Sequence, residues 1–265
     1  MDKKAFTLVE LLVVVAVLGL LASIVFSNLR EVKGSARISN IMQFEASTHR
    51  LLGADIIGWW KLDGNAEDVS GYNNHGSLFN VEWVDGRMGQ GQAGSFSNSY
   101  INIGTGDDYF PLHIFSIGVW IKTPGLGQEM SMNGIVSITY GLTVYLTSSG
   151  NLAFRMDDGS SIPSITVIKS LHDDEWHHIL VSFDGIDRRM YIDGELMRVT
   201  EFVGWTGSTR WPTNYARIGC ENNNCSIYKF NGLIDDIRIY SRALTTSEIQ
   251  TLYAQTKDKY LADMD

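Results

Sequence analysis

The chain has 265 residues, of which 44% are apolar and 19% charged, so it can bury a core and does not have the composition of a disordered chain. Its formal charge of −9 argues against a nucleic acid as a partner, because a phosphate backbone calls for an excess of Lys and Arg. Gly occurs 26 times and Pro only 4 times, which favours a β protein with many tight turns over a Pro-rich linker.

The chain starts with a short basic stretch and a long apolar run. Residues 11–26 read LLVVVAVLGLLASIVF, with Ser23 the only polar side chain. Extended back to Phe6, the run makes a helix of about 31 Å, which spans a bilayer. A cleaved secretory signal also begins with basic residues, but no small-x-small cleavage pattern ends this run and helical sequence continues beyond it.

Glu10 interrupts the apolar run four residues after Phe6. A carboxylate at membrane depth is costly unless it is neutralised or paired, and a plain anchor has no use for one. The stretch KKAFTLVELL around it, residues 3–12, resembles the processing site of type IV pilins and type II secretion pseudopilins. Ala5 stands where that family prefers Gly.

This resemblance implies a sequence of events for the precursor in the inner membrane. A prepilin peptidase cuts between Ala5 and Phe6, and the new amino terminus of Phe6 is N-methylated. Glu10 then pairs with the amino terminus of a neighbouring pilin subunit during assembly. The protein is thus expected to be membrane-anchored first and later part of an extracellular filament, either a pilus or a pseudopilus.

Helical spacing continues past the apolar run. Between residues 28 and 52 apolar positions recur at helical spacing among charged ones, and Gly53 is a natural stop. We therefore expect one helix of about 70 Å over residues 6–52. Its first half would lie in the membrane or the filament core, and its second half against the head domain.

After Gly53 the pattern changes to short alternating runs broken by Gly, Asn and Asp. Runs of this kind, as in residues 99–104, 115–122 and 142–147, predict the strands of a sandwich or barrel. The clearest hairpin is residues 175–195, where Asp-Gly pairs at 184–185 and 193–194 supply the turns.

Helical spacing returns only near residues 245–255. Thr245 or Thr246 is the expected cap. The expected buried side consists of Ile249, Leu252 and Tyr253.

Four segments, in order, resemble LamG-like jelly-roll domains: residues 59–71 (WWKLDGNAEDVSG), 115–122 (FSIGVWIK), 175–195 (containing WHH and YIDGE) and 230–253 (FNGLIDDIRIYSRALTTSEIQTLY). The resemblance implies an α+β chain, with a long amino-terminal pilin-type helix followed by an antiparallel two-sheet β-sandwich of the concanavalin A-like type. Its first and last strands are expected side by side. The expected divisions are a leader at 1–5, the helix at 6–53, the jelly-roll head at 54–256 and a tail at 257–265.

The same resemblance implies a structural calcium ion. The aspartate matching Asp235 often binds one in this family, together with main-chain oxygens near the start of the domain. Asp63, Asn65 and Asp68 lie in the first loop and offer oxygen ligands of the kind that calcium accepts. The alternative is that these side chains cap turns, as Asp and Asn beside Gly usually do.

Cys220 and Cys225 are the only cysteines and flank a short polar loop. Zinc would need further ligands at finger-like spacing, and none is near. A local disulfide is expected if the domain is exported, and free thiols are the alternative. His177 and His178 do not suggest zinc either, because neighbours on a strand point to opposite faces.

The remaining candidates concern carbohydrate. Glucanases with this sandwich carry Glu-x-Asp-x-x-Glu on one strand, and the chain has no such motif and no Gly-x-Ser-x-Gly, so we do not expect an enzyme.

Trp205, Trp211 and Tyr215 lie in a Gly/Thr/Asn-rich stretch, where they either stack on a glycan or simply pack. We therefore expect a type IV pilin-like structural subunit that displays the sandwich. The alternative is a minor pilin or adhesin whose head binds a glycan or another surface ligand.

Overall fold

The computed structural model describes most of the head domain. It covers residues 53–87, 91–105, 114–124, 132–138, 142–156, 164–202, 215–221, 225 and 228–258, together with Leu8, Leu12, Val13, Val15, Val17 and Leu18. These six amino-terminal residues are helical and exposed. Among all described residues, no helix is long and apolar enough to cross a membrane. The helix predicted over residues 6–52, with Phe6 and Glu10, otherwise lies outside the described residues.

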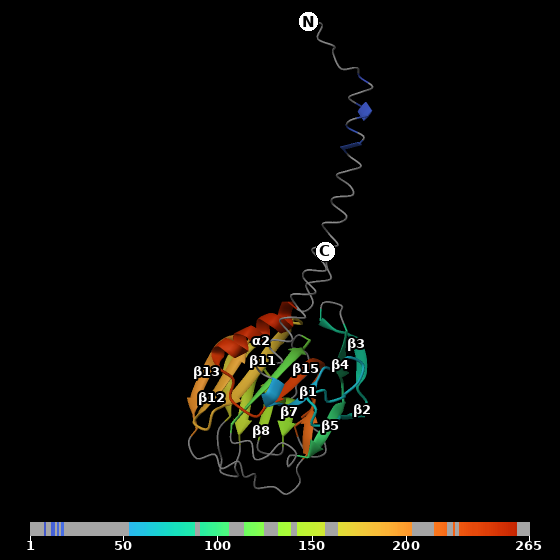
Figure 1. Cartoon of the computed structure of the whole chain (residues 1–265). Helices are drawn as coiled ribbons and strands as arrows, with labels where there is room; N and C mark the ends of the chain where they lie inside the picture. The colour runs from blue at the N-terminus through green and yellow to red at the C-terminus, as the bar shows by residue number, and fades with distance from the viewer. Residues whose placement is uncertain are drawn as a thin grey trace.

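The described part of the head forms two antiparallel sheets that pack face to face (Figure 1). The eight-stranded sheet contains, in hydrogen-bonding order, β13 (Glu195–Glu201), β12 (Asp187–Ile192), β11 (Trp176–Phe183), β6 (Phe115–Lys122), β15 (Gly232–Tyr240), β4 (Gln92–Phe96) and β3 (Glu82–Asp85), with β1 (Ile56–Trp60) also paired to β15. The seven-stranded sheet contains β10 (Ile165–Ser170), β9 (Asn151–Met156), β8 (Leu142–Thr147), β7 (Met132–Ile138), β14 (Tyr215–Ile218), β5 (Tyr100–Thr105) and β2 (Ser77–Phe79). The predicted sandwich is confirmed, and its first and last strands, β1 and β15, are neighbours as expected.

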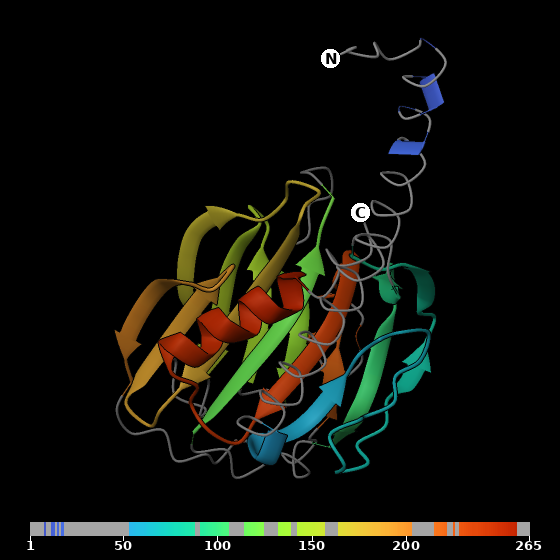
Figure 2. The ribbon, with the colours of Figure 1, turned by 45° about the horizontal axis from the view of Figure 1, so that its top comes forward.

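The eight-stranded sheet is covered on both faces. Along β11, Ile179 and Val181 face the interior between the sheets, whereas Leu180 contacts the apolar cluster formed with α2 (Thr246–Asp258). Figure 2 shows α2 lying across the outer face of this sheet. Strands covered on both faces read as nearly continuous apolar runs, which explains sequences such as FSIGVWIK in β6.

The hairpin predicted for residues 175–195 is confirmed as β11 and β12. At its turn, Asp184 Oδ1 accepts hydrogen bonds from the N–H groups of Ile186 (3.0 Å) and Asp187 (2.8 Å). The next turn, between β12 and β13, has positive φ at both central residues, 52° at Asp193 and 77° at Gly194. Such a turn matches the twist of paired strands, and Gly is favoured where φ is positive.

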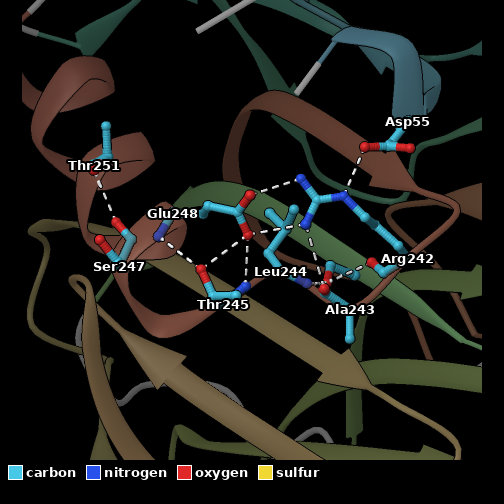
Figure 3. Close-up of polar contacts among 9 residues, drawn as sticks. Asp55, Arg242, Ala243, Leu244, Thr245, Ser247, Glu248 and Thr251 are labelled. Atoms are coloured by element: carbon cyan, nitrogen blue, oxygen red, sulfur yellow. Dashed lines mark hydrogen bonds and ion pairs between the residues drawn. The ribbon is translucent and has the colours of Figure 1, made fainter. Parts of the chain in front are cut away.

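The start of α2 is held by a capping box and an ion pair (Figure 3). Thr245 Oγ1 accepts a hydrogen bond from the Glu248 N–H at 3.3 Å, and the Glu248 carboxylate accepts one from the Thr245 N–H at 2.8 Å. Arg242, just after β15, donates to Glu248 Oε1 at 2.7 Å and to Asp55 Oδ2 at 2.6 Å. These contacts tie α2 to the first turn of the domain, η1 (Gly53–Asp55). The predicted cap at Thr245 is confirmed.

A second polar contact lies on the outer face of the eight-stranded sheet, where the register of β15 against β6 shifts between Asp235 and Arg238. Asp235 Oδ2 accepts a hydrogen bond from Arg87 Nε at 2.9 Å, and both side chains are buried. The Arg87 guanidinium also lies 4.1 Å from the centre of the Trp120 ring and donates to the carbonyl of Thr256 in α2. Burial raises the pKa of Asp235 to about 7, although the Arg87 cation acts in the opposite direction.

Glu248→Ala tests the anchoring of α2. The variant loses both the helix cap and the carboxylate that pairs with Arg242, so we expect the free energy of unfolding to fall by about 1–2 kcal/mol in urea denaturation. Thr251→Ala is the matched control, because it removes an exposed hydroxyl that bonds only within the helix. If Glu248→Ala costs no more than Thr251→Ala, the cap is not what holds α2.

Asp235→Asn tests the buried aspartate through the pH dependence of stability. The pKa of Asp235 rises from 3.8 to about 7 on folding, so between these pH values the folded chain keeps a proton that the unfolded chain releases. Asp235 therefore lowers stability as pH rises from about 4 to about 7, by at most about 1.4 kcal/mol per pH unit. Asp235→Asn should flatten this slope in urea denaturation, whereas the exposed Asp85→Asn should not. An unchanged slope in Asp235→Asn would contradict the assignment.

Candidate functional site

A row of polar side chains crosses the outer face of the seven-stranded sheet. Residues opposite each other on antiparallel strands point to the same face. On six neighbouring strands the register brings polar residues opposite one another, and we call them the polar row: Ser77 (β2), Asn102 (β5), Arg217 (β14), Ser137 (β7), Thr143 (β8) and Arg155 (β9). Five steps of about 4.8 Å make the row about 24 Å long.

The polar row lies on the outer side of its sheet because its neighbours along each strand face inward, although Thr143 (0% exposed), Ser137 (3%) and Arg217 (7%) are buried there. Ala216 and Ile218, on either side of Arg217, are buried in the core between the sheets. The same holds for the apolar residues on either side of Arg155, Phe154 and Met156. Since successive side chains alternate, only the inner face of this sheet has to be apolar for the sandwich to form.

A short disulfide loop lies beside the row. The predicted disulfide between Cys220 and Cys225 is present. It encloses Glu221, whose carboxylate forms an ion pair with Arg155 and whose carbonyl accepts a hydrogen bond from Ser137 Oγ at 3.0 Å. Arg217 Nη1 donates to the sulfur of Cys225 at 3.1 Å. The disulfide thus fastens the only described carboxylate that pairs with the row.

Aromatic rings flank one end of the row. Phe79 stacks on Tyr100 with ring centres 4.8 Å apart, and we call these two residues with Tyr215 the aromatic ledge. The Arg217 guanidinium lies 5.0 Å from the centre of the Tyr100 ring and 4.5 Å from that of Tyr215. Phe79 and Tyr215 are 45% and 42% exposed, so the ledge has faces open to solvent.

The buried polar atoms in this region that lack a hydrogen-bond partner include Thr143 Oγ1, Arg155 Nε and Glu221 Oε2. A buried polar atom without a partner costs about 1–3 kcal/mol. These atoms are buried, so the groups open to solvent on this face are the rings of the ledge, Phe79 and Tyr215. The exposed ledge beside the polar row makes this face the best candidate for a ligand.

Of the three aromatic residues that the sequence analysis proposed for ligand binding, Tyr215 is the one described on this face. Trp205 and Trp211 lie outside the described residues. The polar row was missed, although alternation within YINIG and NLAFR carried the signal of an outer polar face. Its alignment across six strands depends on register, which the sequence did not supply.

The three polar residues proposed from the first loop hold turns and neighbouring backbone. Asp68 accepts hydrogen bonds at 2.9 Å from the N–H groups of Trp59, Ser70 and Asn74. Although burial opposes it, these bonds keep the pKa of Asp68 below its ordinary value. Asn65 Oδ1 accepts from the N–H two residues on, at 2.9 Å, and Asp63 Oδ1 accepts from the first N–H of β4 at 3.0 Å.

Asp235, the fourth residue proposed as a calcium ligand, is paired with the Arg87 guanidinium at 2.9 Å. Within the described ranges, no three acidic, His or Cys groups come together in a way that could hold a metal ion. The hydrogen bonds fit the turn-capping alternative. Calcium stays a prediction that comes from the resemblance.

The two histidines lie on opposite faces of β11, as predicted. His177 contacts Asp193 at 2.8 Å and Asp173 at 3.0 Å, and the bond to Asp193 raises its pKa. His178 is buried on the outer side, with its ring centre 5.2 Å from that of Trp120, and burial lowers its pKa to about 3. Each histidine therefore has a separate structural environment.

Comparison with known proteins finds two families in the chain. Residues 94–250 match the model of the concanavalin A-like lectin/glucanases superfamily, and residues 1–26 match that of the prokaryotic N-terminal methylation motif. Among curated proteins, Paraclostridial mosquitocidal protein 1 of Paraclostridium bifermentans is 26% identical over 218 residues. That match covers 71% of this chain but only 16% of the toxin.

Solved structures share the fold at low identity. The binding domain of Paraclostridial mosquitocidal protein 1 has a TM-score of 0.59 at 22% identity, covering 76% of this chain and 52% of that one. Botulinum neurotoxin type C, whose cell entry depends on interaction with two ganglioside molecules, has a TM-score of 0.61 at 17% identity, covering 77% and 52%. Domain 4 of AbnA, an extracellular arabinanase from Geobacillus stearothermophilus solved with arabinotriose, has a TM-score of 0.58 at 18% identity, covering 75% and 98%.

The two-sheet sandwich is the fold expected from the family model that matches the head. The matched methylation motif contains Phe6 and Glu10, the two residues that the sequence analysis singled out. The chain belongs to the concanavalin A-like lectin/glucanases superfamily and carries a type IV pilin-like methylation motif at its amino terminus.

Proposed function

We propose that the protein is a type IV pilin-like subunit of an extracellular filament, pilus or pseudopilus, and that its head binds carbohydrate through the polar row and the aromatic ledge. The observation that carries the binding role is the alignment of polar side chains across six strands beside exposed rings.

The amino-terminal motif supports the filament role. It implies that a prepilin peptidase removes residues 1–5 from a precursor anchored in the inner membrane, and that other pilin subunits are the partners in assembly. Glu10 lies within the matched segment, where a buried carboxylate needs a positive partner. The amino terminus of a neighbouring Phe6 is such a partner.

The chemistry of the outer face supports the carbohydrate role. A saccharide offers many hydroxyl groups and apolar ring faces, so its binding site combines hydrogen-bonding side chains with aromatic surfaces. The polar row supplies the first and the aromatic ledge the second. Relatives in fold include a domain solved with arabinotriose and a toxin that interacts with gangliosides.

The sequence favoured a purely structural subunit, with the adhesin as the alternative. The exposed rings of Phe79 and Tyr215 beside the polar row favour the adhesin, because an open aromatic face can stack on a sugar ring. The two roles are compatible, because assembly depends on Phe6 and Glu10 at the amino terminus, whereas binding depends on the β-sandwich head.

Glu10→Ala tests assembly. We expect the variant to be processed to the same mass as the wild type, with residues 1–5 removed, but to give few or no surface filaments in electron micrographs. Glu31→Ala, which removes an acid further along the chain, is the control and should leave filaments at normal numbers. Normal filaments in Glu10→Ala, or a mature protein that keeps Met1, would contradict the pilin role.

Tyr215→Ala tests the binding role. We expect the full-length protein to bind saccharides on a glycan array, and the variant to bind about tenfold more weakly because one stacking surface is lost. Tyr72→Ala is the control, since Tyr72 is an exposed ring (59%, against 42% for Tyr215) in the loop between β1 and β2. A wild-type protein that binds no saccharide, or a Tyr215→Ala variant that binds as the wild type does, would contradict carbohydrate binding at this face.

A further inference from the structure

We infer that Arg217 is a positioning residue for the proposed saccharide site: it fixes the rings of the aromatic ledge, and the Cys220–Cys225 disulfide fixes Arg217 in turn. This inference rests on the carbohydrate-binding role proposed above. It adds a residue that acts on the site without having to touch the saccharide.

Arg217 stands between two rings of the ledge. Its guanidinium lies 5.0 Å from the centre of the Tyr100 ring and 4.5 Å from that of Tyr215. A guanidinium is planar and is attracted to aromatic faces, so one arginine can hold both rings. Phe79 stacks on Tyr100 with ring centres 4.8 Å apart, so the hold extends to the third ring. Arg217 thus connects rings from β2, β5 and β14.

The position of Arg217 suits support better than contact with a ligand. Its side chain is buried, whereas Phe79 and Tyr215 are open to solvent. A saccharide that approaches this face would therefore meet the rings. Rings that are fixed before binding do not have to be ordered by the ligand, which makes binding tighter.

The disulfide holds the other end of this contact. Arg217 Nη1 donates to Cys225 Sγ at 3.1 Å, and both half-cystines are buried. Cys225 has a φ of 48°, a conformation that a residue other than Gly keeps only where its surroundings impose it. The bond to Cys220, just beyond β14, ties Cys225 to the strand that carries Arg217 and Tyr215.

The disulfide loop is itself seated on the sheet. A Cβ added at Gly134 of β7 would come within 2.6 Å of the Glu221 nitrogen, so the loop backbone lies directly against that strand. The Glu221 N–H donates to the Tyr228 carbonyl at 3.0 Å, and the Glu221 carbonyl accepts from Ser137 Oγ. The sheet therefore fixes the loop, the loop fixes Arg217, and Arg217 fixes the rings.

Fluorine NMR of the full-length protein labelled with fluorotyrosine tests the positioning without any ligand. Signals of Tyr100 and Tyr215 are assigned from Tyr→Phe variants. We expect both signals to shift in Arg217→Met and in the double variant Cys220→Ala/Cys225→Ala. Arg188→Met is the control, because Arg188 is also a buried arginine, and its guanidinium lies 4.6 Å from the centre of the Phe202 ring, away from the ledge. It should leave both signals in place.

Saccharide binding tests the consequence. A glycan array that carries arabinotriose, lactose and sialyllactose identifies a saccharide, and isothermal titration calorimetry then gives its Kd. We expect Arg217→Met and the double cysteine variant to bind about fivefold more weakly, because the ligand then has to order the rings. Arg217→Lys keeps the charge but not the plane and should not restore binding. The loss caused by removing the disulfide should shrink in a Tyr215→Ala background, since part of its effect passes through that ring.

The outcomes separate the inference from the proposed function. Unchanged signals of Tyr100 and Tyr215 in both variants would overturn the inference, whichever saccharides bind. Shifted signals with unchanged affinity, or a loss of affinity that is the same with and without Tyr215, would overturn it too. If the signals shift but the wild-type protein binds no saccharide on the array, the carbohydrate role is overturned and Arg217 only orders the rings. Should the double cysteine variant fail to fold, Arg217→Met and Arg217→Lys carry the same test.

Discussion

Burial of apolar side chains between the two sheets is the interaction on which the rest of the head depends. Phe115 from one sheet meets Phe154 from the other with ring centres 6.1 Å apart, and Phe183 packs on the same ring. Each large apolar side chain that becomes fully buried contributes about 1.5–3 kcal/mol. Because strands alternate, this inner layer decides which residues of every strand are left for the outer faces.

The two outer faces are used differently. The eight-stranded sheet carries α2, so its outer face contributes Leu180 and Tyr191 to a second apolar cluster and buries the Arg87–Asp235 pair. The seven-stranded sheet instead presents the polar row, with a disulfide loop beside it. Helix α2 and the proposed ligand face therefore lie on opposite sides of the sandwich.

The amino-terminal end of the head lies on the sheet that carries α2. The head begins at η1 and β1, and β1 belongs to the eight-stranded sheet beside β15. A head held in a filament through its amino-terminal end would thus be attached on the side of that sheet. The polar row lies on the other sheet.

Local patterns in the sequence were sufficient for much of the fold. The backbone preferences of neighbouring residues predicted the Asp-Gly turns at 184–185 and 193–194 and the cap at Thr245. Alternation of apolar and polar residues, also a local pattern, predicted the strands. The quoted segments also predicted the pairing of the first and last strands through family resemblance. The disulfide was predicted because its cysteines are the only pair and lie close together in the chain.

The candidate site was decided by tertiary structure. Arg155 and Glu221 are 66 positions apart, and no short-range pattern connects them with Thr143 or Arg217. Only the register of six strands, set by how the apolar faces of two sheets fit together, aligns these residues in one row. The contact between Asp235 and Arg87 has the same origin, because these residues are 148 positions apart and only packing brings them together. Turns and strand faces are local properties, whereas which charges meet depends on contacts across the whole fold.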